Sequence, residues 1–465
     1  MTPDEFCRHG YAAVDWLAHY LAHVRDYPVL PACQPGDLID ALPASAPEHG
    51  EPMEQILADF EREIVPRATH WNHPRFHSFF AISSSPPGVI AEALAAGLNM
   101  QHMLWKSGPS GTELEQVTLD WLRQWMGLEE QWFGEIFDTA SISTLHGIAA
   151  ARELAAPEAR QQGQPAGLTV YCSQFAHTSV DKACIMLGLG LDHLRKVPVD
   201  DQYRLRPDAL AEMIRADRAA GKTPMCVVPT VGTTGVTSVD PVREVVRIAR
   251  QENLWVHVDA AYGGAAAIVP EYRHYLDGVD GADSMVVNPH KWIFCPVDLS
   301  CFYTRRPDIV RRAFSLVPDY LSYAENPRLV NFMDYGLPLG RRFRSLKLWF
   351  VMRYFGYEGV TRMIRQQIEW SQEMTALVAA DDRFELMAPT TMGLVCLRMK
   401  GPDELSKALV EQINDSGFAF LSQTTLRGHF TIRWAIGTYA CTREDLLAVW
   451  SRIQDTAAQL IAASR

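Results

Sequence analysis

The sequence contains no apolar run long enough to cross a membrane, since no stretch reaches about 18 uncharged apolar residues. Its first ten residues, MTPDEFCRHG, are polar and acidic and lack the apolar core of a secretory signal. Basic residues are also scarce, because 43 Lys and Arg stand against 55 Asp and Glu, which gives a net charge of −12. A chain with this charge lacks the basic surface that neutralises phosphates, which argues against nucleic acid as its main partner.

The nine cysteines are scattered and include no C-x-x-C pair. This pattern favours reduced thiols over disulfides or a zinc site, so we expect no metal and a cytoplasmic location. Hydrophobic residues make up 48% and charged residues 21% of the 465 residues, which is typical of a folded soluble protein with more than one small core.

The hydrophobic pattern divides the chain into three regions. Residues 1–85 are expected to form helices with Pro-rich joints, and their apolar faces need another surface, such as a partner subunit. Residues 86–345 alternate short β-branched runs with amphipathic helices, which indicates an α/β domain with a buried, mainly parallel sheet flanked by helices. Residues 346–465 change to helix, strands and helix, which is typical of a smaller C-terminal α+β domain.

Within the central region, β-branched and aromatic runs predict strands, and amphipathic stretches predict the helices between them. A capping box is also expected, with Thr112 and Glu115 starting the helix that contains VTLDWLRQWM. The predicted strands are 168–173, 225–232, 255–262, 284–290 and 299–304, and the predicted helices are 177–188, 206–221 and 242–253.

Polar residues follow several of these strands. In an open α/β sheet, ligands bind beyond the carboxyl ends of the strands. Thr230, Asp259 and Lys291 stand at three such ends, and His177 follows a fourth. The segment DTASISTLHGIAAAR adds hydroxyls and backbone N–H groups at the start of a predicted helix, which suits a phosphate.

This combination has a chemical meaning. A lysine amine can bind an aldehyde cofactor as a Schiff base, and a carboxylate can pair with a pyridinium nitrogen. Pyridoxal 5′-phosphate (PLP) requires both groups and a phosphate site. Lys291 stands between apolar neighbours in NPHKWIFCP, and covalent attachment of a cofactor explains a lysine at a position entering a core.

Each residue also has a structural explanation. Lys291 could extend its ammonium group to the surface, and Asp259 could cap a helix or form a buried ion pair. His177 could be a hydrogen-bonded core histidine, Ser141 an N-cap residue, and Asp240 a residue that opens a turn.

The motifs HVDAAYGGA, NPHKW, PLGRRFRSLKLW and HWNHPRF together resemble the group II PLP-dependent amino-acid decarboxylases, and most of all the aromatic-L-amino-acid decarboxylases. The resemblance extends over about residues 2–445. It implies PLP fold type I, the aspartate-aminotransferase-like fold, with a seven-stranded type of sheet. It also implies a homodimer whose active sites are shared between the subunits.

The resemblance assigns cofactor roles to single residues. Lys291 corresponds to the lysine that binds PLP covalently, and Asp259 to the aspartate that contacts the pyridine nitrogen. His177 and Ala261 correspond to residues on the two faces of the ring. The remaining cofactor-binding positions implied in this way are Ala140, Ser141 and Asn288 for the phosphate, with Thr230 and His290 lining the site.

The implied reaction is decarboxylation of an aromatic L-amino acid to its amine and CO2. The carbon that loses CO2 must then be protonated, and the acid implied by the resemblance is Tyr320 in FSLVPDYLSYAENPR. Relatives with phenylalanine at this position consume oxygen and form aldehydes, so Tyr320 favours the amine. Decarboxylation-dependent oxidative deamination to an aromatic acetaldehyde is the alternative reaction.

The substrate is indicated less directly. Phe79, Phe80 and Ile82 could clasp a planar side chain, although two of them lack hydroxyls that are frequent in the family. The segment from Met100 to Met103 corresponds to one that reaches the partner's pocket, and its Gln101 and His102 leave a more polar amino acid open as substrate. Met103, in the same segment, is also expected to contact the substrate. Gly340 argues against histidine as the substrate, and no role is assigned to Arg433.

Two other classes of protein are compatible with parts of the pattern. His257, Asp259 and His290 spell the facial triad of a non-haem iron oxygenase, but that chemistry usually sits on an all-β fold. A catalytically inactive binding protein on the same fold would lack the lysine, the aspartate or the loop tyrosine, and all three are present.

Overall fold

The computed structural model describes residues 1–316 and 329–463. The chain forms two compact units, and the domain boundaries expected near residues 85 and 345 stay predictions. The larger unit comprises Ile82–Thr375 and Ala388–Cys396, and the smaller comprises Met1–Ala81, Ala376–Met387 and Leu397–Arg465.

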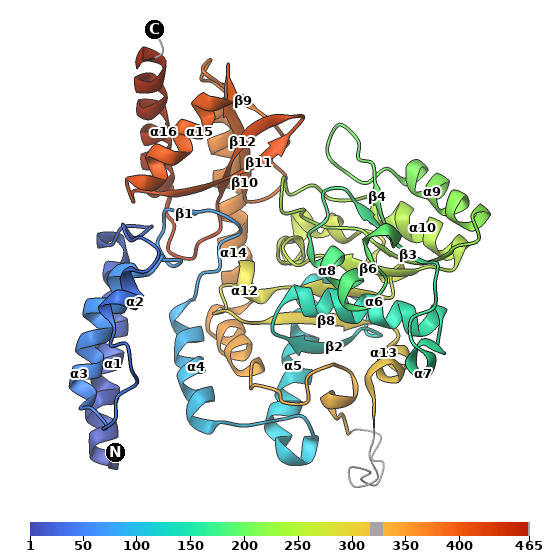
Figure 1. Cartoon of the computed structure of the whole chain (residues 1–465), viewed down its shortest axis with the longest axis horizontal. Helices are drawn as coiled ribbons and strands as arrows, with labels where there is room; N and C mark the ends of the chain where they lie inside the picture. The colour runs from blue at the N-terminus through green and yellow to red at the C-terminus, as the bar shows by residue number, and fades with distance from the viewer. Residues whose placement is uncertain (317–328, 464–465) are drawn as a thin grey trace. The chain divides into compact units, whose positions relative to one another are not determined.

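The larger unit is built on a seven-stranded sheet in the order β2-β8-β7-β6-β5-β3-β4 (Figure 1). The pairs from β7 through β4 are parallel, whereas β8 is antiparallel to both β7 and β2. The expected mainly parallel sheet is therefore confirmed. The strands are β2 (Phe133–Phe137), β3 (Leu168–Ser173), β4 (Leu194–Val197), β5 (Thr223–Val228), β6 (Trp255–Asp259), β7 (Ser284–Val287) and β8 (Ser300–Thr304).

Every residue of β3, β6, β7 and β8 is buried. Strands buried on both faces need cover on both sides, and helices flank the sheet (Figure 1). The predicted helices at 177–188, 206–221 and 242–253 are found as α8, α9 and α10. The helices are α4 (Pro86–Leu98), α5 (Pro109–Met126), α6 (Ala140–Ala155), α7 (Ala159–Gln162), α8 (Ser179–Met186), α9 (Pro207–Ala219), α10 (Val242–Glu252), α11 (Gly263–Ala266), α12 (Pro289–Trp292) and α13 (Pro307–Phe314).

The predicted capping box at Thr112 and Glu115 is wrong. Helix α5 begins one turn earlier, at Pro109, and Gly108 is its N-cap. The Thr112 hydroxyl donates to the carbonyl oxygen of Gly108 over 3.0 Å. Glu115 lies inside the helix, and its side chain contacts residues distant in sequence.

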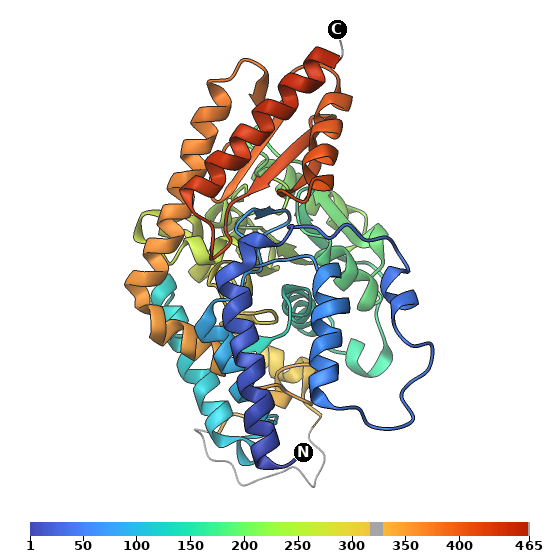
Figure 2. The same ribbon diagram turned by 90° about the vertical axis from the view of Figure 1, so that its left-hand side faces the viewer.

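The smaller unit combines a five-stranded sheet with helices, in the strand order β1-β11-β12-β10-β9. Helices α1 and α3 lie side by side, as Figure 2 shows, and the Trp16 ring packs edge-on against Phe60 at 4.9 Å. The long α14 (Ser345–Ala379) and β10 run across the boundary between the units. The elements are α1 (Pro3–His23), α2 (Asp37–Ala41), α3 (Met53–Asp59), β1 (Phe76–His77), β9 (Phe384–Leu386), β10 (Leu394–Met399), α15 (Asp403–Asp415), β11 (Phe420–Leu426), β12 (His429–Ala435) and α16 (Arg443–Ala463).

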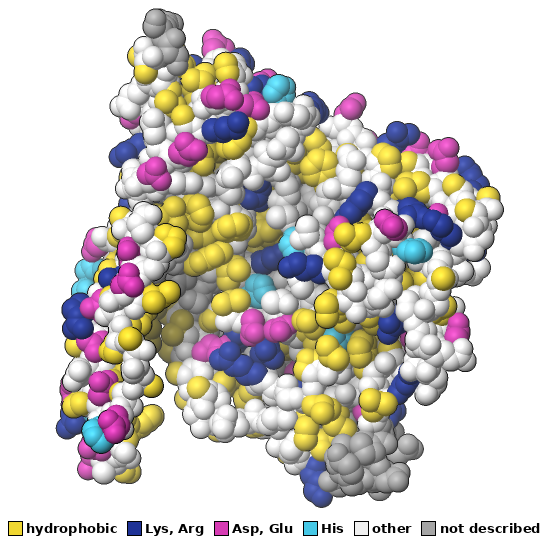
Figure 3. Space-filling model, in the orientation of Figure 1, with side chains coloured by type: hydrophobic (Ala, Val, Ile, Leu, Met, Phe, Trp, Pro, Cys, Tyr) yellow, Lys and Arg dark blue, Asp and Glu magenta, His cyan; other side chains and the backbone are white. Residues whose placement is uncertain are grey.

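The surface agrees with the composition. Acidic and basic side chains are interspersed with apolar ones on the face drawn in Figure 3, without a broad basic area. None of the helices in the described residues combines the length and apolarity needed to cross a membrane. All nine cysteines are free, which agrees with the expectation of reduced thiols.

Helix α6 packs closely on the sheet because Gly147 has no side chain. A Cβ atom there would lie 2.5 Å from Nδ1 of the buried His257 on β6. We expect Gly147→Ala to lower the free energy of unfolding by about 1–3 kcal/mol, since the ring has no room to move. Gly97, in α4, has no atom within 4 Å of its Cβ position. Gly97→Ala is the matched control, and helix propensity predicts that it stabilises the protein by up to about 1 kcal/mol. Urea unfolding of both variants measures the difference, and equal effects would contradict this account of packing.

Candidate active site

A cavity of about 170 Å³ opens in the larger unit, where several parallel strands end. Parallel strands place their carboxyl ends at one edge, so segments far apart in sequence meet there. All nine residues expected to bind the cofactor line this one cavity. The lining consists of Thr139, Ala140, Ser141, His177, Thr230, Gly232, Thr234, Asp259, Ala261, Tyr262, Asn288, His290 and Lys291.

The start of α6 forms one wall of the cavity. Thr139 is the N-cap residue, and Ala140 and Ser141 are the first residues of this 16-residue helix. The Thr139 side chain makes no capping hydrogen bond, so the first N–H groups of the helix remain available to an anion. Ser143, one turn further along α6, does not line the cavity. Its hydroxyl lies 2.8 Å from the buried Ser300 hydroxyl and links α6 to β8.

Asp259 and Lys291 bring opposite charges to the cavity. Asp259 ends β6, and its Oδ1 accepts a hydrogen bond of 3.1 Å from the Ala261 N–H. Burial lowers the pKa of Lys291, while the negative charge of Asp259 opposes this shift. A lowered pKa increases the fraction of neutral amine, which is the form that attacks an aldehyde.

His177 lies in the loop after β3. Its Nδ1 accepts a hydrogen bond of 3.1 Å from the Ser179 N–H, so the neutral ring carries its proton on Nε2. Burial lowers the pKa of His177, although Asp259 opposes the shift. The imidazole is therefore held in one orientation as a largely neutral ring.

His290 and Asn288 sit beside Lys291. Burial lowers the pKa of His290 to about 3, and the positive charges of Lys291 and Lys347 act in the same direction. Nδ1 of His290 accepts a hydrogen bond of 2.9 Å from the Leu299 N–H, and its Nε2 lies 3.3 Å from the side-chain amide of Asn288. This neutral histidine links the segment that carries Lys291 to the backbone at Leu299.

Two buried polar atoms in the cavity wall have no hydrogen-bond partner among the described residues: Oγ1 of Thr230 and Oδ1 of Asn288. Buried polar atoms are almost always paired. Together with the open N–H groups of α6, they fit a bound group that carries both an anion and further polar atoms. The residues present therefore fit PLP.

Asp240 has a structural role, as its structural explanation in the sequence analysis proposed. Its two carboxylate oxygens accept hydrogen bonds from the N–H groups of Leu205, over 2.7 Å, and Thr230, over 2.8 Å. Burial raises the pKa of Asp240 to about 7, and these two bonds oppose the shift. By binding the Thr230 backbone, Asp240 supports the cavity wall from behind.

The facial-triad alternative is not supported by the geometry. His257 is turned away to Ser284, with Nδ1 2.9 Å from its hydroxyl. Across residues 1–316 and 329–463, no group of three or more His, Cys, Asp or Glu side chains is placed to hold a metal ion. His257, Asp259 and His290 thus do not form a metal site.

The six residues expected to contact the substrate are not among those that line this cavity in the single chain. Phe79 is half exposed and has a φ of +53°, a strained conformation for a bulky residue. Arg433 holds this segment, because Nη2 donates to the Phe79 carbonyl oxygen over 3.1 Å and the guanidinium lies 5.7 Å from the centre of the Phe80 ring. The other residues of the set are Ile82, Gln101, Met103 and Gly340, which belong to the larger unit.

His102 was considered with Gln101 as a sign of a more polar substrate, but its side chain does not face the surface. The His102 side chain is fully buried, and its Nε2 lies 3.0 Å from Oε2 of Glu115. It points into the protein, whereas the neighbouring Gln101 is exposed. Tyr320 lies outside the described residues.

Tyr262 is a lining residue that the sequence analysis missed. Its ring stacks on Trp292 with centroids 4.6 Å apart and an angle of 4° between the rings. The signal was present in HVDAAYGGA and NPHKW, since both motifs place an aromatic residue within three positions of a proposed cofactor contact.

A lysine of lowered pKa, an aspartate at a strand end and an open helix N-terminus in one cavity define the site of a PLP-dependent enzyme on an α/β fold. Comparison with known proteins agrees. Residues 35–400 match the family model described as Pyridoxal-dependent decarboxylase conserved domain. The chain therefore belongs to the pyridoxal-dependent decarboxylases, and it is a carboxy-lyase whose cofactor is PLP.

Individual relatives extend this result. The chain is 39% identical to the aromatic-L-amino-acid decarboxylase of Sus scrofa over 480 residues, which cover 100% of this chain and 98% of that protein. It is 37% identical to the phenylacetaldehyde synthase of Arabidopsis thaliana, covering 99% and 97%. The crystal structure of Oryza sativa TDC with PLP and tryptamine superposes with a TM-score of 0.96 at 33% identity, covering 99% of each chain.

The start of α6 provides a direct test of the phosphate site. Ser141→Asp adds a negative charge beside the open N–H groups, so we expect it to weaken PLP binding at least about 100-fold through charge repulsion. Ser141→Ala is the control, because it removes only the hydroxyl and should cost roughly tenfold or less. PLP absorbance titration of the apoprotein measures both affinities. Equal affinities for the two variants would place the phosphate elsewhere.

Proposed function

We propose that this enzyme decarboxylates an aromatic L-amino acid to the corresponding amine and CO2. The observation that carries the proposal is that Lys291, Asp259 and the N-terminus of α6 line the same cavity. The relative named aromatic-L-amino-acid decarboxylase matches along the full length of the chain, which supports this substrate class.

The cavity residues have distinct functions in this proposal. When bound, PLP supplies an electron-withdrawing ring that accepts the electrons left when the carboxylate departs as CO2. Asp259 would pair with the ring nitrogen and keep it protonated, and Lys291 would hold the aldehyde carbon. The first N–H groups of α6 would hold the phosphate. His177 would cover the ring as a neutral, hydrogen-bonded imidazole.

The carbon that loses CO2 must take up a proton. We assign this proton to the phenolic hydroxyl of Tyr320, on the sequence pattern of Pro318, Tyr320 and Leu321. A donor at this step directs the reaction to the amine, because a carbon that stays unprotonated is open to attack by dioxygen.

Two groups of residues are proposed to contact the substrate side chain. Phe79, Phe80 and Ile82 offer apolar surface to an aromatic ring. Gln101, Met103 and Gly340 lie in the same unit as the cavity but outside its lining, so we propose that they reach the cavity of the partner subunit. These three exposed or half-exposed positions are then where one aromatic substrate is distinguished from another.

A homodimer is supported by apolar side chains on the surface. On α4, Ile90, Leu94 and Leu98 are each about half exposed or more, at 57%, 49% and 62%. On α1, Phe6 and Tyr11 are 69% and 71% exposed. Exposed apolar side chains on a helix often mark an interface with another protein, and we propose that a second copy of the chain covers those of α4 and of α1.

Product analysis with purified holoprotein tests the proposal. We expect one amine for each CO2, with kcat/KM at least about tenfold higher for an aromatic amino acid than for any polar one. Lys291→Ala is the control and should release no CO2. Ammonia and peroxide in amounts equal to CO2 would instead support the aldehyde-forming reaction, in line with the relative named phenylacetaldehyde synthase. A polar amino acid as the best substrate would overturn the aromatic assignment.

Tyr320→Phe tests the proton donor. Without the hydroxyl, we expect amine formation to fall and oxygen to be consumed, giving one aldehyde, one ammonia and one hydrogen peroxide for each CO2 released. Tyr323→Phe removes a hydroxyl from the same segment and should leave the product ratio unchanged. Chromatography of amine and aldehyde with a peroxide assay measures the ratio. An unchanged ratio in Tyr320→Phe would mean that another group donates the proton.

A further inference from the structure

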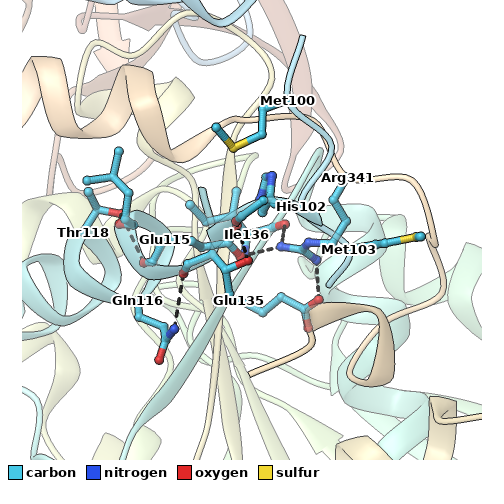
Figure 4. Close-up of polar contacts among 12 residues, drawn as sticks. Met100, His102, Met103, Glu115, Gln116, Thr118, Glu135, Ile136 and Arg341 are labelled. Atoms are coloured by element: carbon cyan, nitrogen blue, oxygen red, sulfur yellow. Dashed lines mark hydrogen bonds and ion pairs between the residues drawn. The ribbon is translucent and has the colours of Figure 1, made fainter. Parts of the chain in front are cut away.

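Four charged or titratable side chains lie together in the interior of the larger unit, outside the cofactor cavity. They are His102, Glu115, Glu135 and Arg341, and none is more than 5% exposed. Figure 4 shows His102 and Arg341 converging on the carboxylate of Glu115, which projects from α5, while Arg341 also bonds to Glu135 on β2. Charged groups are rarely buried in this way unless each is paired.

Every oxygen of the central carboxylate is used. Oε1 of Glu115 accepts from the Ile136 N–H over 2.8 Å and from Arg341, and Oε2 accepts from Nε2 of His102 over 3.0 Å. Burial would raise the pKa of Glu115, but Arg341 and His102 hold it below its ordinary value. Burial raises the pKa of Glu135 to about 8. At neutral pH one ionised carboxylate therefore balances Arg341, and His102 is the donor to it.

This network joins two surface segments that are distant in sequence. Gln101 pairs with Arg342 in an antiparallel bridge, and the Met333 N–H donates to the Met103 carbonyl oxygen over 3.1 Å. The first segment is 101–103, and His102 holds it through the bond to Glu115. The second includes 340–342, and Arg341 holds it through its bond to the same carboxylate.

The side chains of the first segment alternate between inside and outside. His102 is buried, whereas Gln101 is exposed and Met103 is partly exposed. Gly108 makes room for the imidazole, since a Cβ atom at that position would lie 2.6 Å from the His102 Cβ. Gly340, beside Arg341, is exposed with no atom within 4 Å of its Cβ position. Each of the two buried residues is thus next in sequence to more exposed positions, Gln101 and Met103 beside His102 and Gly340 beside Arg341, and we call these three positions the edge.

We propose that His102 is a positioning residue, which by its hydrogen bond to Glu115 sets the place of the Gln101–Met103–Gly340 edge and thereby the choice among aromatic substrates. This inference rests on the proposed function, in which the edge meets the substrate of the partner subunit. His102 itself does not touch the substrate. A displaced edge changes substrate binding while the cofactor site, which has no residue in common with the network, stays intact.

The experiment compares three variants of the holoenzyme. His102→Ala removes the hydrogen bond, His102→Gln keeps a side-chain N–H able to reach Glu115, and Thr118→Val is the matched control. Thr118 lies on the same helix, and its buried hydroxyl donates to the Leu114 carbonyl oxygen over 2.8 Å. The same hydroxyl also lies 3.2 Å from the Glu115 carbonyl oxygen, so its loss removes buried bonds to the backbone of α5 and leaves the Glu115 carboxylate and its bond to His102 in place.

The measurements are KM and kcat for phenylalanine, tyrosine and tryptophan, the Kd of the product amine by calorimetry, the PLP absorbance spectrum and Tm. For His102→Ala we expect KM and the amine Kd to rise about tenfold for the best substrate, and the KM ratios among the three to fall toward one. We expect kcat within about twofold of wild type and an unchanged spectrum. His102→Gln should restore KM to within about threefold, and Thr118→Val should lower Tm without moving any KM ratio.

Two outcomes would overturn the inference. The first is that the wild type is active on aromatic amino acids and His102→Ala has the same KM ratios as the wild type. The other is parallel losses of kcat, cofactor absorbance and Tm in His102→Ala and Thr118→Val, which would give His102 a structural role alone. A wild type without activity on any aromatic amino acid would overturn the proposed function itself, and the two failures are thereby separated.

Discussion

The parallel pairing of β5, β6 and β7 is the constraint on which the rest of the site depends. Parallel strands all end at the same edge of the sheet, so the residues after them must meet there. Thr230, Asp259 and Lys291 come from three such segments. Although β2 is separated from β7 by the antiparallel β8, it runs in the same direction as β7 and delivers the start of α6 to the same edge.

Burial acts on the groups at this edge in a consistent way. It lowers the pKa of Lys291, His177 and His290 and so favours their neutral forms. A neutral amine is a nucleophile, and neutral imidazoles can be held by single hydrogen bonds from the backbone. The same effect on Glu115 is outweighed by Arg341 and His102, because a fully paired carboxylate keeps its charge in the interior. Burial without a close partner therefore favours neutral groups in the cavity, whereas burial with full pairing keeps Glu115 charged.

Most of the sheet could be predicted from the sequence, because β3 and β5 to β8 are short β-branched or aromatic runs between amphipathic helices. The two edge strands, β2 and β4, were not predicted, because FGEIF and LRKV contain charged residues and are too short to show a period. Glu115 was misread as part of a capping box. Its partner Arg341 is 226 residues away, and a local pattern cannot register such a contact.

The sequence by itself determined the cofactor chemistry, because Thr230, Asp259 and Lys291 stand at predicted strand ends, which local patterns reveal, and the family motifs around them imply the other positions expected to bind PLP. Tertiary structure decided which neighbouring residues face outward. In the run from Gln101 to Met103 the histidine looked like a polar contact for the substrate, yet it is buried against Glu115 while its neighbours remain at the surface. Only packing between distant segments selects the inward side chain, because burying a polar ring requires a partner that the local sequence does not contain.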